Sequence, residues 1–156
     1  MDENRIWKSI AAGLCGSAAH HLLMTFKSWA HLLPSFQPYN DLQNILAGFT
    51  GGSVHPWLPW ALSYFNGSVV LGFLFGRVYR RLPGRNGAMK GAAFGFAVWL
   101  AMGLVFFPLL GKGLFAAQTA LGFVPTAFTL LMVLTYSVTL GVAYSLLDPQ
   151  RRKTPP

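Results

Sequence analysis

Four long stretches of apolar residues dominate the chain, and shorter polar segments separate them. They cover roughly residues 6–26, 58–76, 91–110 and 124–147. Each stretch is about 20 residues long, which is the length that an α-helix needs to cross the hydrocarbon core of a bilayer. No acidic residue lies within any of them. The pattern therefore predicts an all-α membrane protein, a four-transmembrane-helix bundle in which residues 1–156 form a single transmembrane domain.

The composition agrees with this pattern. The chain is 53% hydrophobic and only 10% charged, well below the roughly 25% charged residues of an ordinary soluble domain. A net charge of +8 would otherwise favour nucleic acid as a partner, but the basic residues flank the apolar stretches and form no single face. We therefore expect the lipid bilayer as a partner and no nucleic acid. The single cysteine, Cys15, cannot form an internal disulfide, and we expect it to be a buried packing residue.

Lysine and arginine are distributed unevenly around the four stretches. One side of the expected membrane has ten of them: Arg5, Lys8, Arg77, Arg80, Arg81, Arg85, Lys90, Arg151, Arg152 and Lys153. The other side has two, Lys27 and Lys112. Basic residues beside membrane spans concentrate on the cytoplasmic side. We therefore expect a multi-pass protein of a bacterial inner membrane whose N- and C-termini both lie in the cytoplasm.

The first outer loop, residues 27–57, contains a short amphipathic pattern. Its apolar positions follow the spacing of one helix face: Leu42, Ile45, Leu46 and Phe49. Asn40 and Gln43 fit a capping box at its start, and Gly51-Gly52 fits its end. This pattern predicts a short interfacial helix that lies in the outer membrane surface.

Small residues recur four positions apart within the expected helices. Lipid chains are as apolar as leucine, so helices in a membrane associate by close backbone approach at such residues. We therefore expect six glycines at helix–helix contacts: Gly13, Gly72, Gly76, Gly91, Gly95 and Gly141.

The chain also contains two similar helix pairs. Lys8-Ser9 is followed by Gly13, and Lys90-Gly91 is followed by Gly95 at the same spacing. Residues 68–72 (Ser-Val-Val-Leu-Gly) likewise match residues 137–141 (Ser-Val-Thr-Leu-Gly). The pattern favours two parallel-repeated helix pairs related by an axis along the membrane normal. Chance similarity between glycine-rich helices is the alternative.

The second half of the chain, residues 87–147, resembles a known group of proteins. The matching parts are Gly91-Ala-Ala-Phe-Gly95, residues 107–115 (Phe-Pro-Leu-Leu-Gly-Lys-Gly-Leu-Phe), and residues 136–147 with Gly141-Val-Ala-Tyr144. They are similar to uncharacterised small bacterial four-helix inner-membrane proteins, a domain-of-unknown-function family. The resemblance implies a four-helix inner-membrane bundle and supplies no activity.

Catalytic motifs are missing from the sequence. The acidic residues Asp2, Glu3, Asp41 and Asp148 all lie outside the apolar stretches, so no pair of carboxylates is available within them for acid–base chemistry. No nucleophile elbow, zinc-protease motif or phosphate-binding glycine loop is present either. We therefore expect that the protein is not an enzyme.

Histidine is the feature that points to a site. His20 and His21 lie in the outer half of the first stretch, and an ionisable residue within a membrane helix is a functional hypothesis by default. Neighbours on a helix are about 100° apart, so we do not expect both rings to reach one spot. We expect at least one of them to have a buried partner, most simply a carbonyl or hydroxyl group.

Two hypotheses in which the histidines bind a cofactor remain open, besides the simpler one in which the protein binds none. In the first, His20 or His21 is a single axial ligand to haem or (bacterio)chlorophyll, with Gly16 one turn earlier leaving room for a flat ring. In the second, several histidines, including the loop residues His31 and His55, form a copper or zinc site.

These observations favour a non-catalytic integral membrane protein, a small accessory or scaffolding subunit that packs against a larger membrane complex or against copies of itself. One alternative is a small oligomeric transporter or channel for a neutral solute. Another is attachment of a pigment or haem through His20 or His21. A continuous polar cavity favours transport, whereas a solid bundle with an apolar outer face favours the accessory role.

Overall fold

The computed structural model describes residues 3–33, 36–109, 111–118 and 121–148, and this part of the chain is all-helical. It contains five helices. They are α1 (Glu3–Trp29), α2 (Pro38–Thr50), a second long helix (Trp57–Val78), a third long helix (Gly87–Leu109) and α7 (Val124–Leu147). The second long helix consists of α3 (Trp57–Phe65), η1 (Asn66–Leu71) and α4 (Gly72–Val78), and the third of α5 (Gly87–Ala101), η2 (Met102–Phe106) and α6 (Phe107–Leu109). A single 3₁₀ turn, η3 (Leu114–Ala116), lies in the last loop.

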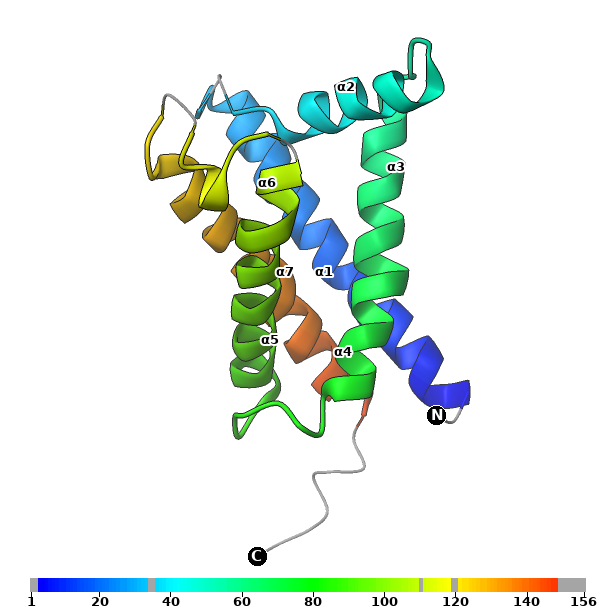
Figure 1. Ribbon diagram of the computed structural model, residues 1–156. Coiled ribbons are helices and arrows are strands. Elements are labelled where there is room, and N and C mark those ends of the chain that lie inside the picture. The colour runs from blue at the N-terminus through cyan, green and yellow to red at the C-terminus, as the bar shows by residue number, and fades with distance from the viewer. Residues whose placement is uncertain (1–2, 34–35, 110, 119–120, 149–156) are drawn as a thin grey trace, which may run out of the picture.

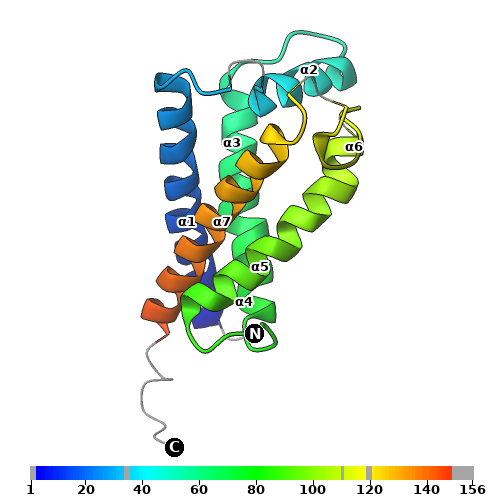
Figure 2. The ribbon, with the colours of Figure 1, turned by 90° about the vertical axis from the view of Figure 1, so that its left-hand side faces the viewer.

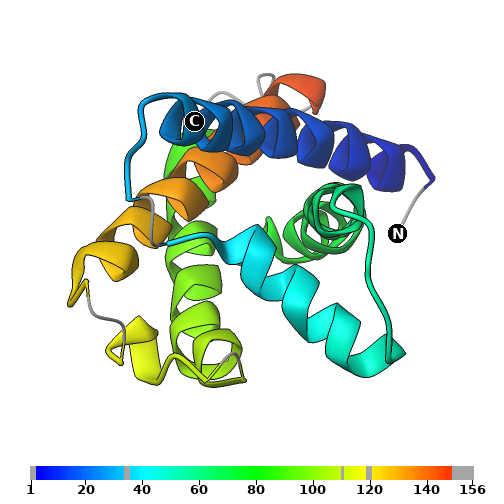
Figure 3. The same cartoon turned by 90° about the horizontal axis from the view of Figure 1, so that it is seen from above.

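The four long helices form one bundle, and α2 lies across one end of it (Figure 1). The helix α1 begins and α7 ends at the opposite end, so the two ends of the described chain lie on the same side (Figure 1). α7 lies between α1 and α5 (Figure 2) and contacts both extensively. Seen from above, α2 lies beside the second long helix, on the side away from α1 (Figure 3).

Three of the long helices are apolar and long enough to span a membrane: Trp57–Val78, Gly87–Leu109 and Val124–Leu147. The prediction of four such helices was therefore wrong by one, because α1 is long enough but is not apolar enough. Its predicted stretch includes Lys8, Ser9, Ser17 and the His20-His21 pair, which lower its average hydropathy. For α1, only the predicted length is confirmed, and the predicted apolar character is not.

Glycine allows α1 and the second long helix to approach very closely, along a contact that we call the α1 seam. A methyl group added at Gly13 would lie 2.5 Å from the carbonyl oxygen of Ser68, and one added at Gly72 would lie 2.7 Å from that of Ser9. One added at Gly76 would collide with the Ser9 hydroxyl. Only glycine fits at these positions without moving a backbone or the buried serine.

The contact between α5 and α7, the α7 seam, is built in the same way. A methyl group at Gly91 would collide with the carbonyl of Ser137, and one at Gly141 would collide with the carbonyl of Gly87. One at Gly95 would lie 2.7 Å from the Ser137 hydroxyl oxygen. The structure thus places all six glycines singled out in the sequence at buried helix–helix contacts.

The second and third long helices each contain a π-helical turn, η1 and η2, where the regular hydrogen-bonding pattern widens. Such turns are rare and leave backbone groups available to side chains. In η1 the carbonyl of Gly67 accepts a 2.6 Å hydrogen bond from the Tyr136 hydroxyl of α7. This bond ties the second long helix to α7 through the middle of the bundle.

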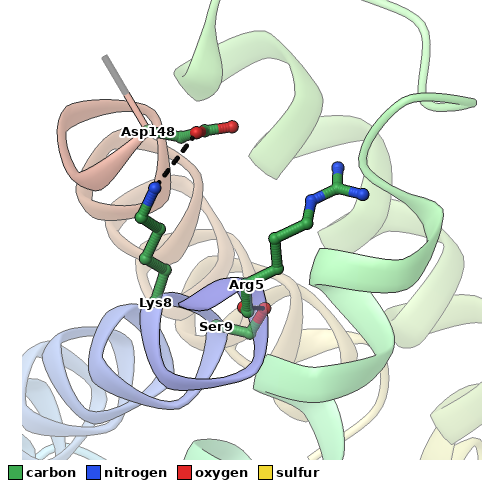
Figure 4. Close-up of polar contacts among 4 residues, drawn as sticks. All are labelled: Arg5, Lys8, Ser9 and Asp148. Atoms are coloured by element: carbon green, nitrogen blue, oxygen red, sulfur yellow. Dashed lines mark hydrogen bonds and ion pairs between the residues drawn. The ribbon is translucent and has the colours of Figure 1, made fainter. Parts of the chain in front are cut away.

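At the end where the chain begins, α1 and α7 are linked by an ion pair. The Lys8 ammonium lies 3.3 Å from an Asp148 carboxylate oxygen, and the Ser9 hydroxyl donates a 2.7 Å hydrogen bond to the Arg5 carbonyl. Figure 4 shows Lys8 directed at Asp148 and the Arg5 side chain projecting away from this pair. Because both charged groups are partly exposed, the ion pair is worth at most about 1 kcal/mol.

Two local expectations were wrong. Cys15 is exposed on the outer face of α1 and not buried, because it lies on the side of the helix opposite the seams. The capping box at Asn40 and Gln43 does not form, because α2 begins earlier at Pro38 and the Gln43 amide donates to the Val54 carbonyl instead. The predicted end is present, since Gly51 has the left-handed φ of 68° that favours glycine.

We expect Gly91→Ala to lower the thermal stability of the purified protein, because the added methyl group meets the Ser137 backbone. Overpacking of this kind costs about 1–3 kcal/mol. Gly48→Ala is the matched control, since nothing lies within 4 Å of a methyl group there and alanine favours a helix. Equal melting temperatures for the two variants would show that the α7 seam is looser than described.

Candidate functional site

The main polar cluster lies at the end of the bundle that α2 crosses, where three helices meet. His20 and His21 come from α1, Tyr39 from the first turn of α2, and Ser63 from α3. Pro38 positions Tyr39, since proline is favoured in the first turn of a helix and begins α2 there. The cluster therefore depends on α2 docking across the end of the bundle.

The Tyr39 hydroxyl is the centre of this cluster. Its oxygen lies 3.3 Å from His20 Nε2, 3.3 Å from His21 Nε2 and 3.2 Å from the Ser63 hydroxyl oxygen. The expectation that the two rings cannot reach one spot was wrong. The rings diverge from α1 edge to face, with centroids 5.4 Å apart, and Tyr39 enters from another helix at a point that both nitrogens can reach.

The hydrogen bonds of His21 fix its tautomer. Its Nδ1 lies 2.8 Å from the Ser17 carbonyl oxygen, which can only accept, so Nδ1 carries a proton. In the neutral ring Nε2 is then an acceptor, and the Tyr39 hydroxyl donates to it. The buried His21 thus has the carbonyl and hydroxyl partners that the sequence led us to expect.

Aromatic rings line the polar cluster. The Tyr64 ring stacks on His21 with centroids 3.9 Å apart, and the Trp60 ring stacks on Tyr39 at 4.2 Å. His21 is buried, and burial raises the pKa of the Tyr39 hydroxyl because the charged phenolate is poorly solvated there. Tyr39 is therefore a neutral hydrogen-bond donor at pH 7.

A second cluster at the same end of the bundle surrounds Phe36. Lys27 is only 2% exposed and donates a 2.6 Å hydrogen bond to the Phe36 carbonyl. Lys112 forms an ion pair with Asp41 and lies 5.6 Å from the centroid of the Phe36 ring. Lys27 and Lys112 thus hold the loops at this end of the bundle against α1.

The structure does not bring His31 and His55 into the polar cluster. Both are exposed, and His55 Nδ1 accepts a 3.4 Å hydrogen bond from the Trp57 backbone N–H. Within the described residues no group of three or more histidine, cysteine, aspartate or glutamate side chains is placed to hold a metal ion. A site made from all four histidines is therefore not assembled.

The space next to His20 on α1 is also filled. Gly16, one turn earlier, faces the Tyr136 ring, whose carbon atoms lie 2.9 Å from where a methyl group on Gly16 would be. The room that Gly16 leaves is therefore taken by α7. A flat macrocycle against this face of α1 would have to displace Tyr136.

An apolar cavity of about 620 Å³ lies between the third long helix, the last loop and α7. Its walls include Trp99, Phe115, Phe123 and Thr126. The Trp99 indole N–H donates a 3.2 Å hydrogen bond to the Thr126 carbonyl, and the Thr126 hydroxyl donates to the Phe115 carbonyl. These polar groups are paired with one another, so the cavity presents an apolar surface.

Sequence reasoning missed Tyr39, Ser63 and Tyr64 as members of the site. The only available signal was Pro38-Tyr39 at the start of an amphipathic segment that follows a histidine pair. Trp60 of α3 was missed as well. Its stacking on Tyr39 depends on the position of α2, which local sequence does not determine.

The chain matches, over residues 3–154, the protein family described as a "Family of unknown function (DUF6789)". No curated protein and no solved structure matches the chain.

We expect Tyr39→Phe to loosen α2 from the bundle. The variant keeps the ring on Trp60 but removes the hydroxyl that binds His21 and Ser63, and a buried acceptor left unpaired costs about 1–3 kcal/mol. Hydrogen exchange of the α2 amides should speed up. Tyr64→Phe is the control, since the Tyr64 hydroxyl has no hydrogen bond in the described part of the chain. Unchanged hydrogen exchange in Tyr39→Phe would show that the Tyr39 hydroxyl does not hold α2 to the bundle.

Proposed function

The chain belongs to the DUF6789 family, whose function is unknown, and we propose that it is a non-catalytic bacterial inner-membrane protein with four membrane-spanning helices. We further propose that it acts as a small accessory subunit that packs against a larger membrane complex. Average hydropathy leaves α1 out of the set of helices that could span a membrane.

The two faces of α1 support its role as the fourth span. Its polar side chains Ser9, Ser17 and His21 are buried against the other helices, whereas its outer face is apolar. Trp7 and Trp29 lie near its two ends and are 67% and 77% exposed. They are 22 residues apart, which at 1.5 Å per residue is about 33 Å, close to the thickness of the hydrocarbon core. Tryptophan is favoured at both membrane surfaces.

The observation that carries the accessory role is a strip of small residues on this outer face. Ala11, Cys15 and Ala18 are all exposed and lie one or two turns apart, with Leu14 and Leu22 beside them. Inside the bundle, small residues mark the places where another backbone comes close. A strip of them turned outward fits a helix from another chain, which we infer to be the partner subunit.

The arrangement of the seams supports two parallel-repeated helix pairs. Gly13 faces Ser68 in the α1 seam, and Gly95 faces Ser137 in the α7 seam. Ser9 faces Gly72, and Gly91 faces Gly141. These are the pairs that the sequence match aligns, so we infer that both helix pairs use one packing design.

The two alternatives rank lower for structural reasons. Two buried hydroxyls without a partner in the described part of the chain, those of Ser137 and Tyr144, favour a transporter. The close helix contacts at the glycines, however, leave no space for a solute along either seam. Attachment of a pigment or haem requires a free His20 or His21 Nε2, and both nitrogens are directed at Tyr39.

For the orientation, we expect cysteines introduced at Arg85 and Ser53 in a Cys15→Ser background to react with impermeant maleimide from opposite sides. Both positions are exposed, and the basic residues concentrate at the Arg85 end. The cysteine at Ser53 should be labelled from the periplasm and that at Arg85 only after the membrane is opened. Labelling of both from one side would reject the four-span topology.

For the accessory role, the native Cys15 can carry a thiol-linked photo-crosslinker in whole membranes. We expect light to join the chain to a second membrane protein, and Ala18→Leu to reduce the yield because leucine fills the strip. The matched control is Cys15→Ser with Val105→Cys, an exposed position on the third long helix, which should give lipid adducts only. A product containing two copies of this chain would indicate self-association. Lipid adducts alone from Cys15 would refute the accessory role.

A further inference from the structure

We propose that the arginines at the end of the bundle opposite α2 form a binding surface for anionic phospholipid headgroups. This surface, which we call the arginine patch, consists of Arg5 in the first turn of α1 and four residues at and after the end of α4: Arg77, Arg80, Arg81 and Arg85. The proposal rests on the membrane-spanning arrangement proposed above, because only a chain that crosses the bilayer holds this end among headgroups. It is independent of the accessory role.

The described lysines and arginines have different surroundings. Each described lysine bonds to a protein oxygen, which is a carboxylate for Lys8 and Lys112 and a backbone carbonyl for Lys27 and Lys90. The arginine patch contains every described arginine, and none of its guanidinium groups has a hydrogen bond or ion pair with the described residues. The carboxylates of Asp41 and Asp148 are already paired with lysines. A counter-charge for the patch must therefore come from outside the described chain.

The arginine patch borders an apolar surface. Arg77 is exposed in the last turn of α4, and the exposed Phe73 and Leu74 lie four and three residues before it on the same helix face. On α1, the exposed Trp7 lies two residues from Arg5, and tryptophan is favoured at the membrane surface. The guanidinium groups thus begin where the exposed apolar side chains end, which is the depth of lipid phosphates. This border favours a lipid over a soluble anion.

Guanidinium groups are well suited to a phosphate ligand. Their planar N–H donors bind two phosphate oxygens at once, which a lysine ammonium does not do. Clusters of about four to eight basic residues beside the cytoplasmic ends of membrane helices bind anionic lipids. The phosphate of phosphatidylglycerol is uncompensated, whereas that of phosphatidylcholine is balanced by its own ammonium group. Charge complementarity therefore predicts a preference for the anionic headgroup.

The loop that carries most of the patch is fixed by its backbone and caps and does not depend on its arginine side chains. The backbone N–H groups of Arg81 and Leu82 donate to the Val78 carbonyl where α4 ends. Where α5 begins, the Asn86 side chain accepts a 2.8 Å hydrogen bond from the Met89 backbone N–H. Substitution of the exposed loop arginines should therefore leave the fold intact.

The test uses the full-length protein in phosphatidylcholine vesicles that contain a trace of spin-labelled phosphatidylglycerol or spin-labelled phosphatidylcholine. Electron paramagnetic resonance separates labels that are restricted at the protein surface from labels that move freely. We expect a preference for phosphatidylglycerol of at least about twofold, averaged over all lipids around the protein. High salt should remove it.

The triple variant Arg80→Gln/Arg81→Gln/Arg85→Gln should lose most of this preference. The matched control, Arg80→Lys/Arg81→Lys/Arg85→Lys, retains the charge but lacks the planar donors, so it should keep only part of the preference.

Three results would overturn the proposal: equal restriction of both lipids by the unmodified protein, an unchanged preference in the glutamine variant, or the full preference in the lysine variant. A nucleic acid or an acidic protein as the true partner predicts the first of these. If the glutamine variant does not fold, the salt dependence of the unmodified protein decides, and a preference that survives high salt rejects the patch. A chain that does not span the bilayer restricts neither label, which overturns the proposed spans as well.

Discussion

Close backbone approach at the two glycine seams is the constraint on which the rest of the structure depends. At Gly13 and Gly91 no side chain larger than hydrogen fits, so the register of each helix pair is set to within one residue. That register determines which face of α1 turns inward. Ser9, Ser17 and His21 lie four or eight residues apart on the seam side, so the packing of Gly13 also buries the polar side chains of α1. Its outer face is left apolar, although the average hydropathy of the helix is low.

The same register explains why one outer loop makes a polar contact and the other an apolar one. His21 follows Ser9 by twelve residues, and Gly103 follows Gly91 by twelve, so the two occupy corresponding places in the inferred repeat. Each receives an aromatic ring from the loop above. Tyr39 reaches His21, and the Phe115 ring fills the space at Gly103. Gly103 has no side chain, so the Phe115 ring can pack directly against the helix there. His21 occupies the corresponding space, so Tyr39 meets it only through a hydrogen bond from its hydroxyl.

Much of the fold could be predicted from the sequence, because it depends on short-range signals. The lengths of the apolar stretches predicted the long helices, and the spacing of the small residues predicted the helix contacts at the two seams. The site could be predicted only in part. The histidine pair was visible, but Tyr39 lies 18 residues beyond His21 on a helix whose docking is a tertiary event. The exposure of Cys15 was missed for a related reason, since the direction of a helix face depends on which of its small residues meet a neighbour.

The two lysines at the α2 end of the bundle illustrate how structure changes the meaning of a charge count. Lys27 is buried against the Phe36 carbonyl, and Lys112 is paired with Asp41. At the other end, Lys8 is paired with Asp148 in the same way, and Lys90 is buried and donates to the Tyr79 carbonyl. Both ends therefore lose free charge, and the excess of basic residues at the end opposite α2 persists. The proposed orientation rests on this excess.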